Sequence, residues 1–581
     1  MEEVVAVLRS LPGCDRISQN RRYRHCFRVE EAVQLLVEKG TVDSASQAFA
    51  QCQSLYTQGK LQGVGHSLPP SPAAHYYILG NGRSDPLPIT DSLSSTMLID
   101  EYNSELLHCV HPACWEDPTP EGQYDLLVVG GGAAGLISAI TAAQQGSRAA
   151  LIEGHYMGGD CLVSGCVPSK ALLACSNEIA RTKQLSNYGI SLSEPPKLDF
   201  GFIMKRMRRL RAEIAHHDSA EHISNEFGID VYLGYCHFTS PHQVQVNHQL
   251  LTFTKCLLCT GAQPCIPPIT GLDAAPFYTS ETIWDLTELP GTMTFLGGGP
   301  VACELAQAFA RFGSRVSLVT VSGTLLPREE PEAAELISAV FQSEGVSVYT
   351  NSTIVAVTKD SETAFSVHIA GPYSIVLPCD CLVIATGRQP NIHSLSLEKA
   401  NVSLKNGQLD LNDYLQTSNP DIYAAGDVCG LAQFTHAADA MAQLAVSNTF
   451  HGNNDKYSDL KIPRCTYTDP EVAQIGATCT ALQSASIPYQ KTVREFQRND
   501  RKVIEGSSAG FVQLLSSGSQ FLGATVVGTE AAALLPELTL ALTCGLGLGQ
   551  LARTIHPYPT PGEAVKHCAE AALKAYTSLV V

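Results

Sequence analysis

The sequence has little charge, and basic residues are in the minority. Of its 581 residues 16% are charged, and 38 Lys and Arg stand against 56 Asp and Glu, a net charge of −18. This deficit argues against a nucleic-acid partner, because duplex binding depends on Lys and Arg that neutralise phosphates. With 44% hydrophobic residues the chain can bury large cores, and its length predicts about three to five domains.

The sequence also lacks the patterns of targeting and membrane-spanning segments. It begins Met1-Glu2-Glu3, without the basic and apolar regions of a signal peptide or the Arg-rich pattern of a transit peptide. The longest apolar stretch, around residues 531–552, contains Pro536 and Glu537 and several glycines, which predicts buried helix and loop. We therefore expect a cytoplasmic protein.

Cysteine is too sparse for a disulfide scaffold, with 20 cysteines in 581 residues. Most stand singly in apolar segments, where a cysteine is ordinarily a small buried hydrophobe. A short span with His108, Cys109, His111 and Cys114 contains zinc-ligand types, but no second cluster completes four ligands at a usual spacing. We therefore expect no metal site.

The N-terminal 82 residues are predicted to form a separate small domain. Apolar spacing indicates a helix over residues 45–56 and a shorter helix that ends near Gly40, and residues 76–79 have the composition of a strand. With Tyr23 and Cys26-Phe27-Arg28 ahead of them, these features resemble a DEP domain, a winged-helix interaction module. Its arginines between Arg16 and Arg28 are either a solvated face or a contact for acidic lipid heads or an acidic protein surface.

After the N-terminal domain the composition changes twice. Residues 83–121 lack sustained periodicity and are rich in Pro, Ser and Asp, which predicts a linker. From Tyr124 onward, apolar β-branched runs alternate with Ala-rich helical segments, as in parallel sheets with crossover helices. We therefore expect an α/β protein.

The first glycine-rich motif follows a buried-strand run at residues 124–129. Gly130, Gly132 and Gly135 form a G-x-G-x-x-G between that strand and a helix, which predicts a cradle for a pyrophosphate at the helix N-terminus. The next strand ends in Glu153, 23 residues after Gly130, where an acid accepts hydrogen bonds from a ribose diol. The motif predicts a dinucleotide site.

A second copy of the motif lies at Gly297, Gly299 and Ala302, again after a strand. Its following strand, residues 315–321, ends without a carboxylate, which removes the usual mark of NAD. Arg328 lies a few residues further on, where it can serve a 2′-phosphate, so we favour NADPH over NADH. Two dinucleotide sites in one chain predict two cofactors, a flavin and a nicotinamide.

A pair of cysteines follows shortly after Glu153. Cys161 and Cys166 are five positions apart in the run Gly158-Gly-Asp-Cys-Leu-Val-Ser-Gly-Cys-Val-Pro-Ser-Lys170. A disulfide across so short a loop stabilises a fold little, because the entropy gain is smallest for short loops. The spacing therefore favours a redox dithiol, which is reduced by hydride equivalents and reoxidised by a substrate.

Here the chain resembles the class I pyridine-nucleotide-disulfide oxidoreductases, which include glutathione reductase, dihydrolipoamide dehydrogenase and mercuric reductase. The resemblance covers about residues 122–581 and is nearest to mercuric-reductase-like members through the runs at residues 204–211, 217–219 and 325–331. Further motifs of the family recur in order, namely Thr260-Gly261 with Pro264 and Pro267, Ala385-Thr-Gly387-Arg388 with Pro390-Asn391, and the run Thr417–Asp427.

The resemblance implies a role for each matching residue. Cys161 would be the interchange thiol that attacks the substrate, and Cys166 the sulfur that makes a charge-transfer contact with the flavin. Lys170 would lie by the flavin N5, paired with Glu304, and its positive charge favours a thiolate. The remaining cofactor residues would be Gly130, Gly132, Gly135, Glu153, Gly159, Gly261 and Asp427 for FAD, and Gly297, Gly299, Ala302, Glu304, Arg328 and Gly387 for NAD(P).

The resemblance also implies a homodimer and an order of domains. The fold would have two Rossmann-like domains and an α+β dimerisation domain. The expected ranges are 1–82 for the DEP-like domain, 83–121 for the linker, 122–287 and 373–455 for the two parts of the FAD domain, 288–372 for the NAD(P) domain and 456–581 for the dimerisation domain.

The C-terminal loop departs from the disulfide reductases of the family, which supply a His and a Glu to the partner subunit's dithiol. Here Tyr558 occupies the His position, and Glu563 is retained. A tyrosine, with an ordinary pKa near ~10, is a poorer base than an imidazole near ~6.5. Mercuric reductases carry Tyr here too, but they end in a vicinal Cys pair, whereas the last cysteine of this chain, Cys568, is alone. His556 is a second candidate base.

We therefore expect an FAD-dependent, NADPH-using oxidoreductase that serves cell redox homeostasis. Electrons would pass from NADPH through FAD and the dithiol to an acceptor that the sequence does not name: a disulfide, a quinone or a metal ion such as Hg²⁺. The alternative is a signalling or adaptor flavoprotein, anchored to a membrane or partner by residues 1–82, that senses redox state with little turnover.

Overall fold

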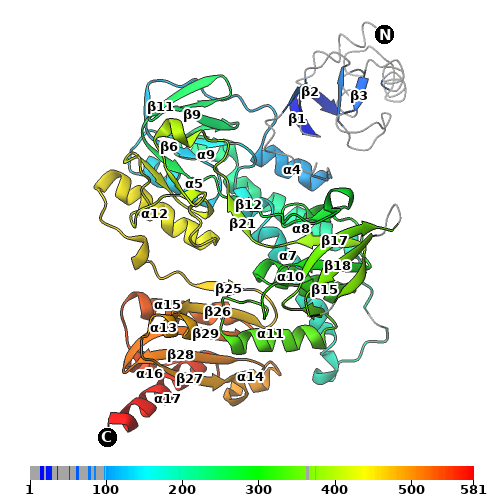
Figure 1. Cartoon of the computed structure of the whole chain (residues 1–581), viewed down its shortest axis with the longest axis vertical. Coiled ribbons are helices and arrows are strands. Elements are labelled where there is room, and N and C mark those ends of the chain that lie inside the picture. Colours follow the sequence, from blue (N-terminus) through cyan, green and yellow to red (C-terminus); the bar gives the residue numbers. More distant parts are fainter. Residues whose placement is uncertain are drawn as a thin grey trace. The chain divides into compact units, whose positions relative to one another are not determined.

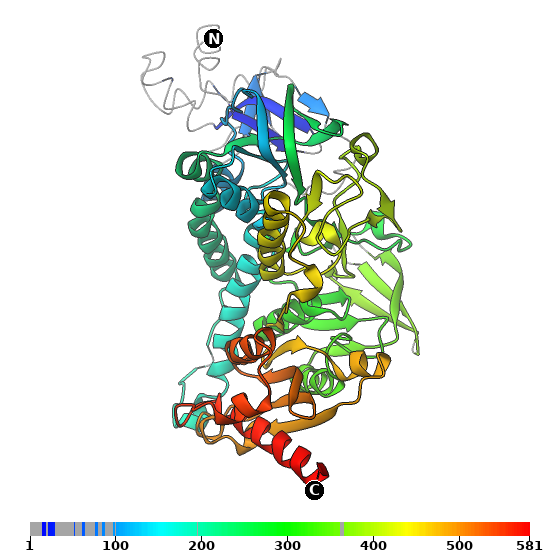
Figure 2. The same ribbon diagram turned by 90° about the vertical axis from the view of Figure 1, so that its left-hand side faces the viewer.

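The computed structural model describes most of the chain from residue 97 onward (Figures 1 and 2). The described residues are 97–98, 100–194, 196–360, 365–372 and 374–580, with five strands, Leu36 and Cys52 nearer the N-terminus. The chain divides into two compact units, one of residues 1–163, 208–259 and 392–403, the other of residues 164–207, 260–391 and 404–581.

The five N-terminal strands pair in the order β1-β2-β4-β3, with β5 also on β2. They are β1 (Cys14–Ser18), β2 (Arg21–Arg28), β3 (Leu61–Gly63), β4 (Tyr76–Leu79) and β5 (Ser84–Pro86). The strand predicted over residues 76–79 is confirmed. The predicted helices lie almost wholly outside the described residues, apart from Leu36 and Cys52, which are helical and buried. The DEP-like domain stays a prediction.

The segment predicted as a linker over residues 83–121 contains a helix, α4 (Glu101–Val110). Asp100 caps it by accepting a hydrogen bond from the Asn103 N–H at 2.8 Å, and Leu106 and Val110 are buried. The prediction of an aperiodic linker is therefore wrong for this part. Its few apolar positions were too sparse to produce a helical pattern in the sequence.

The first unit is built on a mainly parallel sheet with the order β8-β7-β6-β11-β10-β9. Its strands are β6 (Gln123–Val129), β7 (Ala149–Glu153), β8 (Asp230–Leu233), β9 (Cys236–Ser240), β10 (Gln243–Val246) and β11 (Gln249–Leu258). Every residue of β7 is buried, as expected for a parallel strand with both faces covered. Helix α5 (Ala133–Gln144) connects β6 to its parallel neighbour β7, and α9 (Ala220–Phe227) contacts α5.

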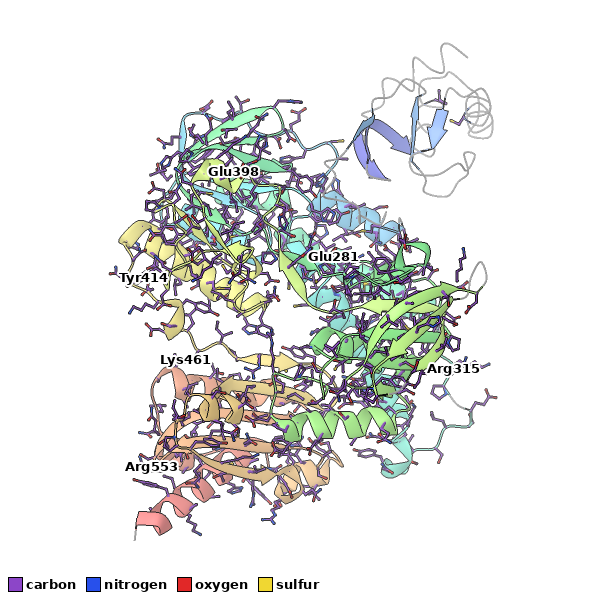
Figure 3. All side chains as sticks on the ribbon, in the orientation of Figure 1. Glu281, Arg315, Glu398, Tyr414, Lys461 and Arg553 are labelled. Atoms are coloured by element: carbon purple, nitrogen blue, oxygen red, sulfur yellow. The ribbon has the colours of Figure 1, made fainter. Side chains whose placement is uncertain are left out.

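The second unit contains another parallel sheet, in the order β13-β20-β14-β15-β16. Its strands are β13 (Phe277–Tyr278), β14 (Thr292–Leu296), β15 (Arg315–Val319), β16 (Ser347–Tyr349) and β20 (Cys381–Ile384). Helix α10 (Pro300–Phe312) connects β14 to β15, which begins at the Arg315 labelled in Figure 3. Because β13 and β20 belong to it, this sheet extends beyond the predicted range 288–372 at both ends. An antiparallel sheet of β17 (Thr353–Lys359), β18 (Phe365–Ala370) and β19 (Ile375–Cys379) follows β16 in the chain.

The C-terminal part of the second unit is the predicted α+β domain. An antiparallel sheet has the order β25-β26-β29-β28-β27, and its strands are β25 (Arg464–Thr466), β26 (Glu471–Gly476), β27 (Gln490–Glu495), β28 (Phe511–Ser517) and β29 (Gln520–Gly528). Helices α15 (Ala531–Thr543), α16 (Leu548–Arg553) and α17 (Glu563–Val580) share one apolar core with it. The apolar stretch 531–552 therefore forms buried helices, as predicted.

No helix in the described part of the chain combines the length and the apolar character needed to cross a membrane.

The turn between β6 and α5 depends on a close approach at Gly135. A Cβ atom on Gly135 would lie 1.7 Å from the carbonyl oxygen of Gly130, so the helix reaches the strand only without a side chain there. We predict that Gly135→Ala destabilises the protein by about 3 kcal/mol, because the backbone must move to relieve the overlap. The measurement is urea unfolding of the purified protein.

Gly549→Ala is the matched control for this prediction. Gly549 lies within α16, and the nearest atom to an added Cβ is the flexible Arg553 guanidinium at 3.8 Å. The control is expected to be neutral or stabilising by up to about 1 kcal/mol, since Ala favours a helix over Gly. Equal stability of the two variants would contradict the close approach.

Candidate functional site

The first glycine-rich turn has the shape of a phosphate cradle. Gly130 has a φ of +110°, and a Cβ atom on Gly132 would meet nothing nearer than the Cα of Gly159, at 3.7 Å. Gly132 is also the N-cap of α5, and since it has no side chain it leaves the N–H groups of the first helical turn to a ligand. These features fit the pyrophosphate of FAD.

Glu153 lies beside this cradle, at the end of β7. Its carboxylate accepts hydrogen bonds from the N–H groups of Gly131 and His155, each at 2.5 Å. Burial raises the pKa of Glu153 above its ordinary value, and these backbone hydrogen bonds offset only part of that rise. The acid is thus fixed at the edge of the cradle, as the sequence predicted for a residue that binds ribose.

The loop before Cys161 packs on the same cradle. The N–H of Gly158 donates to the carbonyl of Gly131 at 2.8 Å, and a Cβ on Gly159 would lie 2.7 Å from the Cα of Gly132. Gly159 begins the short helix α6 (Gly159–Val163), on which Cys161 is partly buried. The structure therefore brings the predicted FAD residue Gly159 against Gly132.

Cys166 begins the long helix α7 (Cys166–Thr182) in the second unit. Its Sγ lies 3.3 Å from the Oγ1 of Thr435, the first residue of α12 (Thr435–His451). A sulfur at a helix N-terminus feels the positive end of the helix dipole, which stabilises a thiolate. Thr435 was not among the predicted residues, because nothing in the sequence pairs it with Cys166.

Lys170 lies one helical turn beyond Cys166 and pairs with Glu304, as predicted. The Lys170 Nζ lies 2.9 Å from a carboxylate oxygen of Glu304 and 4.4 Å from the centre of the Tyr467 ring. The other Glu304 oxygen accepts a hydrogen bond from the Tyr467 N–H at 2.9 Å. Burial, with the neighbouring Cys465, Glu304 and Cys166, raises the pKa of Tyr467 to about 12, so this ring stays neutral.

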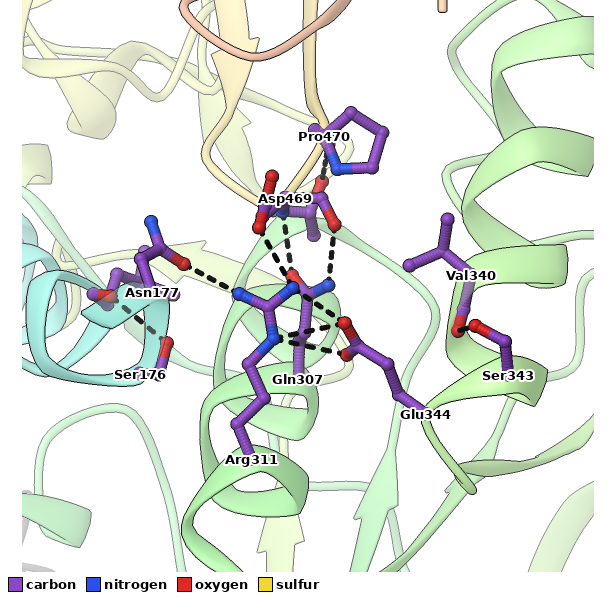
Figure 4. A network of polar contacts seen from close by, with 11 residues as sticks. Ser176, Asn177, Gln307, Arg311, Val340, Ser343, Glu344, Asp469 and Pro470 are labelled. Carbon is purple, nitrogen blue, oxygen red and sulfur yellow. Dashed lines mark hydrogen bonds and ion pairs between the residues drawn. The ribbon is translucent and has the colours of Figure 1, made fainter. Parts of the chain in front are cut away.

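Glu304 belongs to a row of polar residues on α10, and its partners Lys170 and Tyr467 lie on α7 and in the segment before β26. Figure 4 shows two further members of this row, Gln307 and Arg311. Gln307 donates to the carbonyl of Asp469 at 2.7 Å and accepts from its N–H at 2.7 Å. Arg311 is buried and bonds to Glu344 at 2.6 Å, to Asp469 at 3.0 Å and to Asn177 of α7 at 2.7 Å. Gln307 and Arg311 were not among the predicted residues, although polar residues at 304, 307 and 311 have helical spacing within an otherwise apolar segment.

The second glycine-rich turn repeats the geometry of the first with one exchange. Gly297 has a φ of +134°, and a Cβ atom on Gly299 would meet nothing within 4 Å. In the first turn Glu153 packs on Gly131. In the second turn Thr320 takes that place, and its Oγ1 would lie 2.7 Å from a Cβ atom added to Gly298. A hydroxyl therefore stands in place of the carboxylate, and the open turn fits a nucleotide phosphate.

Arg328 belongs to a loop that returns to this second turn. The N–H of Leu326 donates to the carbonyl of Gly298 at 2.8 Å, and the exposed Arg328 follows two residues later. Ala302, at the third motif position, is fully buried in α10.

The later family motifs are joined to one another in the second unit. Strands β12 (Ala262–Pro264) and β21 (Arg388–Pro390) pair antiparallel, and Asn391 exchanges hydrogen bonds with Thr260 at 2.6 and 3.0 Å. Gly261 and Gly387 both have positive φ, with no atom near an added Cβ. Asp427 lies 3.7 Å from the Arg388 guanidinium. The family motifs that come before and after this sheet in the sequence are therefore bonded to one another.

The C-terminal loop holds Tyr558 at the surface. Its side chain is 71% exposed, and its hydroxyl donates to Asp500 at 2.9 Å, which raises the pKa of Tyr558 further above its ordinary value. Glu563 begins α17 and accepts from the Thr560 N–H at 3.3 Å. His556 is a packed residue, with Nε2 2.9 Å from Glu537 and Nδ1 3.2 Å from the Thr554 carbonyl.

The span that contained zinc-ligand types is used for packing. The Cys109 Sγ lies 3.5 Å from His216, and His111 bonds to the carbonyl of His155 at 2.6 Å. In the part of the chain that the structure describes, no three His, Cys, Asp or Glu residues are grouped as metal ligands.

Two family profiles match the chain. Residues 124–442 match "Pyridine nucleotide-disulphide oxidoreductase", and residues 462–569 match the dimerisation domain of the same family. The chain is 33% identical to the mercuric reductase of Streptomyces lividans over 77% of this chain and 96% of that protein. It is 28% identical to a dihydrolipoyl dehydrogenase of Bacillus subtilis (strain 168) over 76% of this chain and 96% of that protein.

Solved structures agree with these matches. The HOCl-induced flavoprotein disulfide reductase RclA from Escherichia coli superposes with a TM-score of 0.69 at 26% identity, over 77% of this chain and 99% of RclA. LpdA from Mycobacterium tuberculosis shares the fold, with a TM-score of 0.71 at 22% identity over 77% of this chain and 99% of LpdA.

Members of the family depend on FAD and take electrons from NAD(P)H, and their dimerisation domain supports a homodimer. The two glycine-rich turns and the C-terminal domain of this chain fit those cofactors and that assembly. The chain belongs to the pyridine nucleotide-disulphide oxidoreductase family.

Proposed function

We propose that the protein is an NADPH-dependent flavin oxidoreductase that passes electrons through the Cys161–Cys166 dithiol to a thiol-binding metal ion such as Hg²⁺. When bound, FAD supplies the exchange of electrons between NADPH and the cysteine pair. The observation that carries the choice of acceptor is the C-terminal loop, where an exposed tyrosine replaces the usual imidazole and the nearby His556 is bonded within its own domain.

Residues of the two glycine-rich turns would hold the cofactors. We assign Gly130, Gly132, Gly135, Glu153, Gly159, Gly261 and Asp427 to FAD, and Gly297, Gly299, Ala302, Arg328 and Gly387 to the nicotinamide nucleotide. The shape of both turns and the position of Glu153 support this assignment.

Within the dithiol, Cys161 would attack the acceptor and Cys166 would exchange electrons with the flavin. The helix N-terminus and Thr435 support a thiolate at Cys166, and Lys170, held by Glu304, adds positive charge one turn away. In the homodimer, Tyr558 and Glu563 would act at the partner subunit's dithiol.

The proton balance favours a metal ion over a disulfide. Two electrons convert a disulfide to two thiols only if two protons are taken up, whereas two electrons convert Hg²⁺ to Hg⁰ without a proton. A site without an imidazole base therefore loses little rate with a metal acceptor. The mercuric reductases among the relatives, and RclA, which has been solved as a Cu(II) complex, support the same class of acceptor. A quinone or a disulfide remains the alternative outcome of the assay.

The dithiol is tested with Cys161→Ser. The variant should keep FAD that NADPH reduces, but lose turnover with Hg²⁺ by at least about a hundredfold, because the nucleophile is gone. NADPH oxidation at 340 nm with Hg²⁺, quinone and disulfide acceptors measures both. Cys175→Ser, at a partly buried cysteine on α7, is the control. Wild-type activity in Cys161→Ser would mean direct transfer from flavin to acceptor.

The nucleotide is tested with Thr320→Glu. A carboxylate against Gly298 should repel the 2′-phosphate of NADPH and bind the 2′-hydroxyl of NADH. We expect the ratio of kcat/KM for NADPH over NADH to fall at least about tenfold, which is about 1.4 kcal/mol.

Val321→Glu adds the same charge next to Thr320 on a side chain that is 72% exposed, and should leave the nucleotide ratio unchanged. Arg328→Ala should raise the KM for NADPH and not for NADH, and this holds even if Thr320→Glu folds poorly. An unchanged ratio in both Thr320→Glu and Arg328→Ala would refute the preference for NADPH.

The role of the C-terminal loop is tested with Tyr558→His. Because Asp500 raises the pKa of Tyr558 above its ordinary value near 10, the hydroxyl stays protonated at neutral pH and Tyr558→Phe should not alter the pH profile between about pH 6 and 9. An imidazole at 558 titrates near ~6.5 and should raise disulfide reduction at least about tenfold.

Tyr576→His, at a partly exposed tyrosine on α17, is the control for an added histidine. If it raises disulfide reduction as much as Tyr558→His, or if the wild type already prefers disulfides, position 558 does not select the acceptor.

A further inference from the structure

Helix α4 precedes residues 124–442, which match the family, yet it is part of the first unit. Leu106, Cys109 and Val110 on one side of it are buried. His216 contacts α4 at two residues one turn apart, with 3.5 Å to the sulfur of Cys109 and 3.2 Å to the carboxylate of Glu105. The helix is therefore packed and not a tether.

The end of α4 holds the loop that leads to Cys161. The carbonyl of Val110 accepts a hydrogen bond from the Met157 N–H at 2.9 Å, and His111 bonds to the carbonyl of His155 at 2.6 Å. Gly158, which follows Met157 in the chain, donates its N–H to the carbonyl of Gly131 in the phosphate cradle at 2.8 Å. One end of the segment 157–163 is thus bonded to both α4 and the cradle.

The start of α4 holds the other end of that segment through a buried arginine. Arg211 of α8 (Phe200–Ala215) is 1% exposed and donates to the carbonyl of Val163 at 2.5 Å and to Asn103 Oδ1 at 2.6 Å. Asn103 is fully buried, and its amide donates to the carbonyl of Leu98 at 2.6 Å. Val163 is the last residue of α6, which carries Cys161.

A second arginine fixes α4 to α8 independently of α6. Arg208 is buried and donates to Asp100, the N-cap of α4, at 2.6 Å. Loss of the hydrogen bond between Asn103 and Arg211 therefore leaves α4 attached to α8 through Arg208. Its main effect would be on the hydrogen bond from Arg211 to the carbonyl of Val163.

We propose that α4 is a brace that positions the Cys161 helix, and that Asn103 and Arg211 are positioning residues for the interchange thiol. This inference rests on the proposed function, in which Cys161 attacks the acceptor. A five-residue helix cannot hold its own geometry, since one turn has too few internal hydrogen bonds. The contacts at Met157 and Val163 fix α6 at both ends, and Asn103 orients the guanidinium that makes the second of them.

The test compares Asn103→Leu with Asn103→Asp. Leu is close in size but gives Arg211 no acceptor, whereas Asp keeps an oxygen for it. After the holoenzyme is reduced with dithiothreitol, mass spectrometry follows alkylation of Cys161 and Cys166 by iodoacetamide. We expect Asn103→Leu to raise the rate at Cys161 about tenfold and Asn103→Asp to restore it, because a released α6 exposes its partly buried thiol.

Asn448→Leu is the matched control. Asn448 is as deeply buried, and its amide donates to the carbonyls of Tyr414 at 3.2 Å and Asp455 at 2.8 Å. It should lower the melting temperature without changing alkylation at Cys161. If the two Leu variants accelerate Cys161 equally at equal loss of melting temperature, α4 only stabilises the fold and the brace is refuted.

A milder variant keeps the test decisive if Asn103→Leu does not fold. Arg211→Lys keeps the charge but lacks the guanidinium group that donates to both Val163 and Asn103. This variant should also raise the rate of alkylation at Cys161. A wild-type rate of alkylation would refute the brace. Alkylation follows chemical reduction and needs no turnover. A wild type that oxidises no NADPH with any acceptor would therefore overturn the proposed function and leave this result standing.

Discussion

The polar face of α10 is the constraint on which the second unit depends. Glu304, Gln307 and Arg311 are all buried, and each must find partners, because an unpaired buried charge or amide costs several kcal/mol. Their partners are Glu344 and residues on α7 and in the segment before β26, so the helix that follows the second glycine-rich turn also fixes the helix that carries Cys166. Glu304 on this face therefore also holds Lys170, which lies one helical turn after Cys166.

The two glycine-rich turns have the same backbone geometry. In each, the middle glycine of the turn faces the end of the following strand: Gly131 packs against Glu153 and Met157, and Gly298 packs against Thr320. They differ in the polar side chain beside the middle glycine, which is a carboxylate in the first turn and a hydroxyl in the second. This is why the acid in the first copy and its absence in the second are informative, while the glycines alone indicate only a phosphate.

Sequence motifs predicted the parts of the site that depend on local geometry. The turns at Gly130 and Gly297 and the acid at Glu153 have the positions expected of them. The pair of Lys170 with Glu304, which are far apart in the sequence, was expected only from the resemblance to the family. Residues recruited from distant segments escaped prediction, since no spacing joins Thr435 to Cys166 or Arg211 to Val163. Helix α4 escaped for another reason: it is stabilised by its Asp100 cap and by buried arginines, and its own apolar pattern is weak.

The two cysteines of the dithiol are supported in different ways, and this difference matches the roles proposed for them. Cys166 begins a 17-residue helix that has its own hydrogen bonds and is fixed by Asn177 to Arg311. Cys161 lies on a helix of five residues that depends on contacts from outside it. A sulfur that faces a cofactor benefits from the rigid position that a long helix gives, whereas a sulfur on a one-turn helix can be positioned for an acceptor only by contacts from outside that helix. The position of Cys161 therefore depends on Arg211 and on α4, whereas that of Cys166 depends on its own helix.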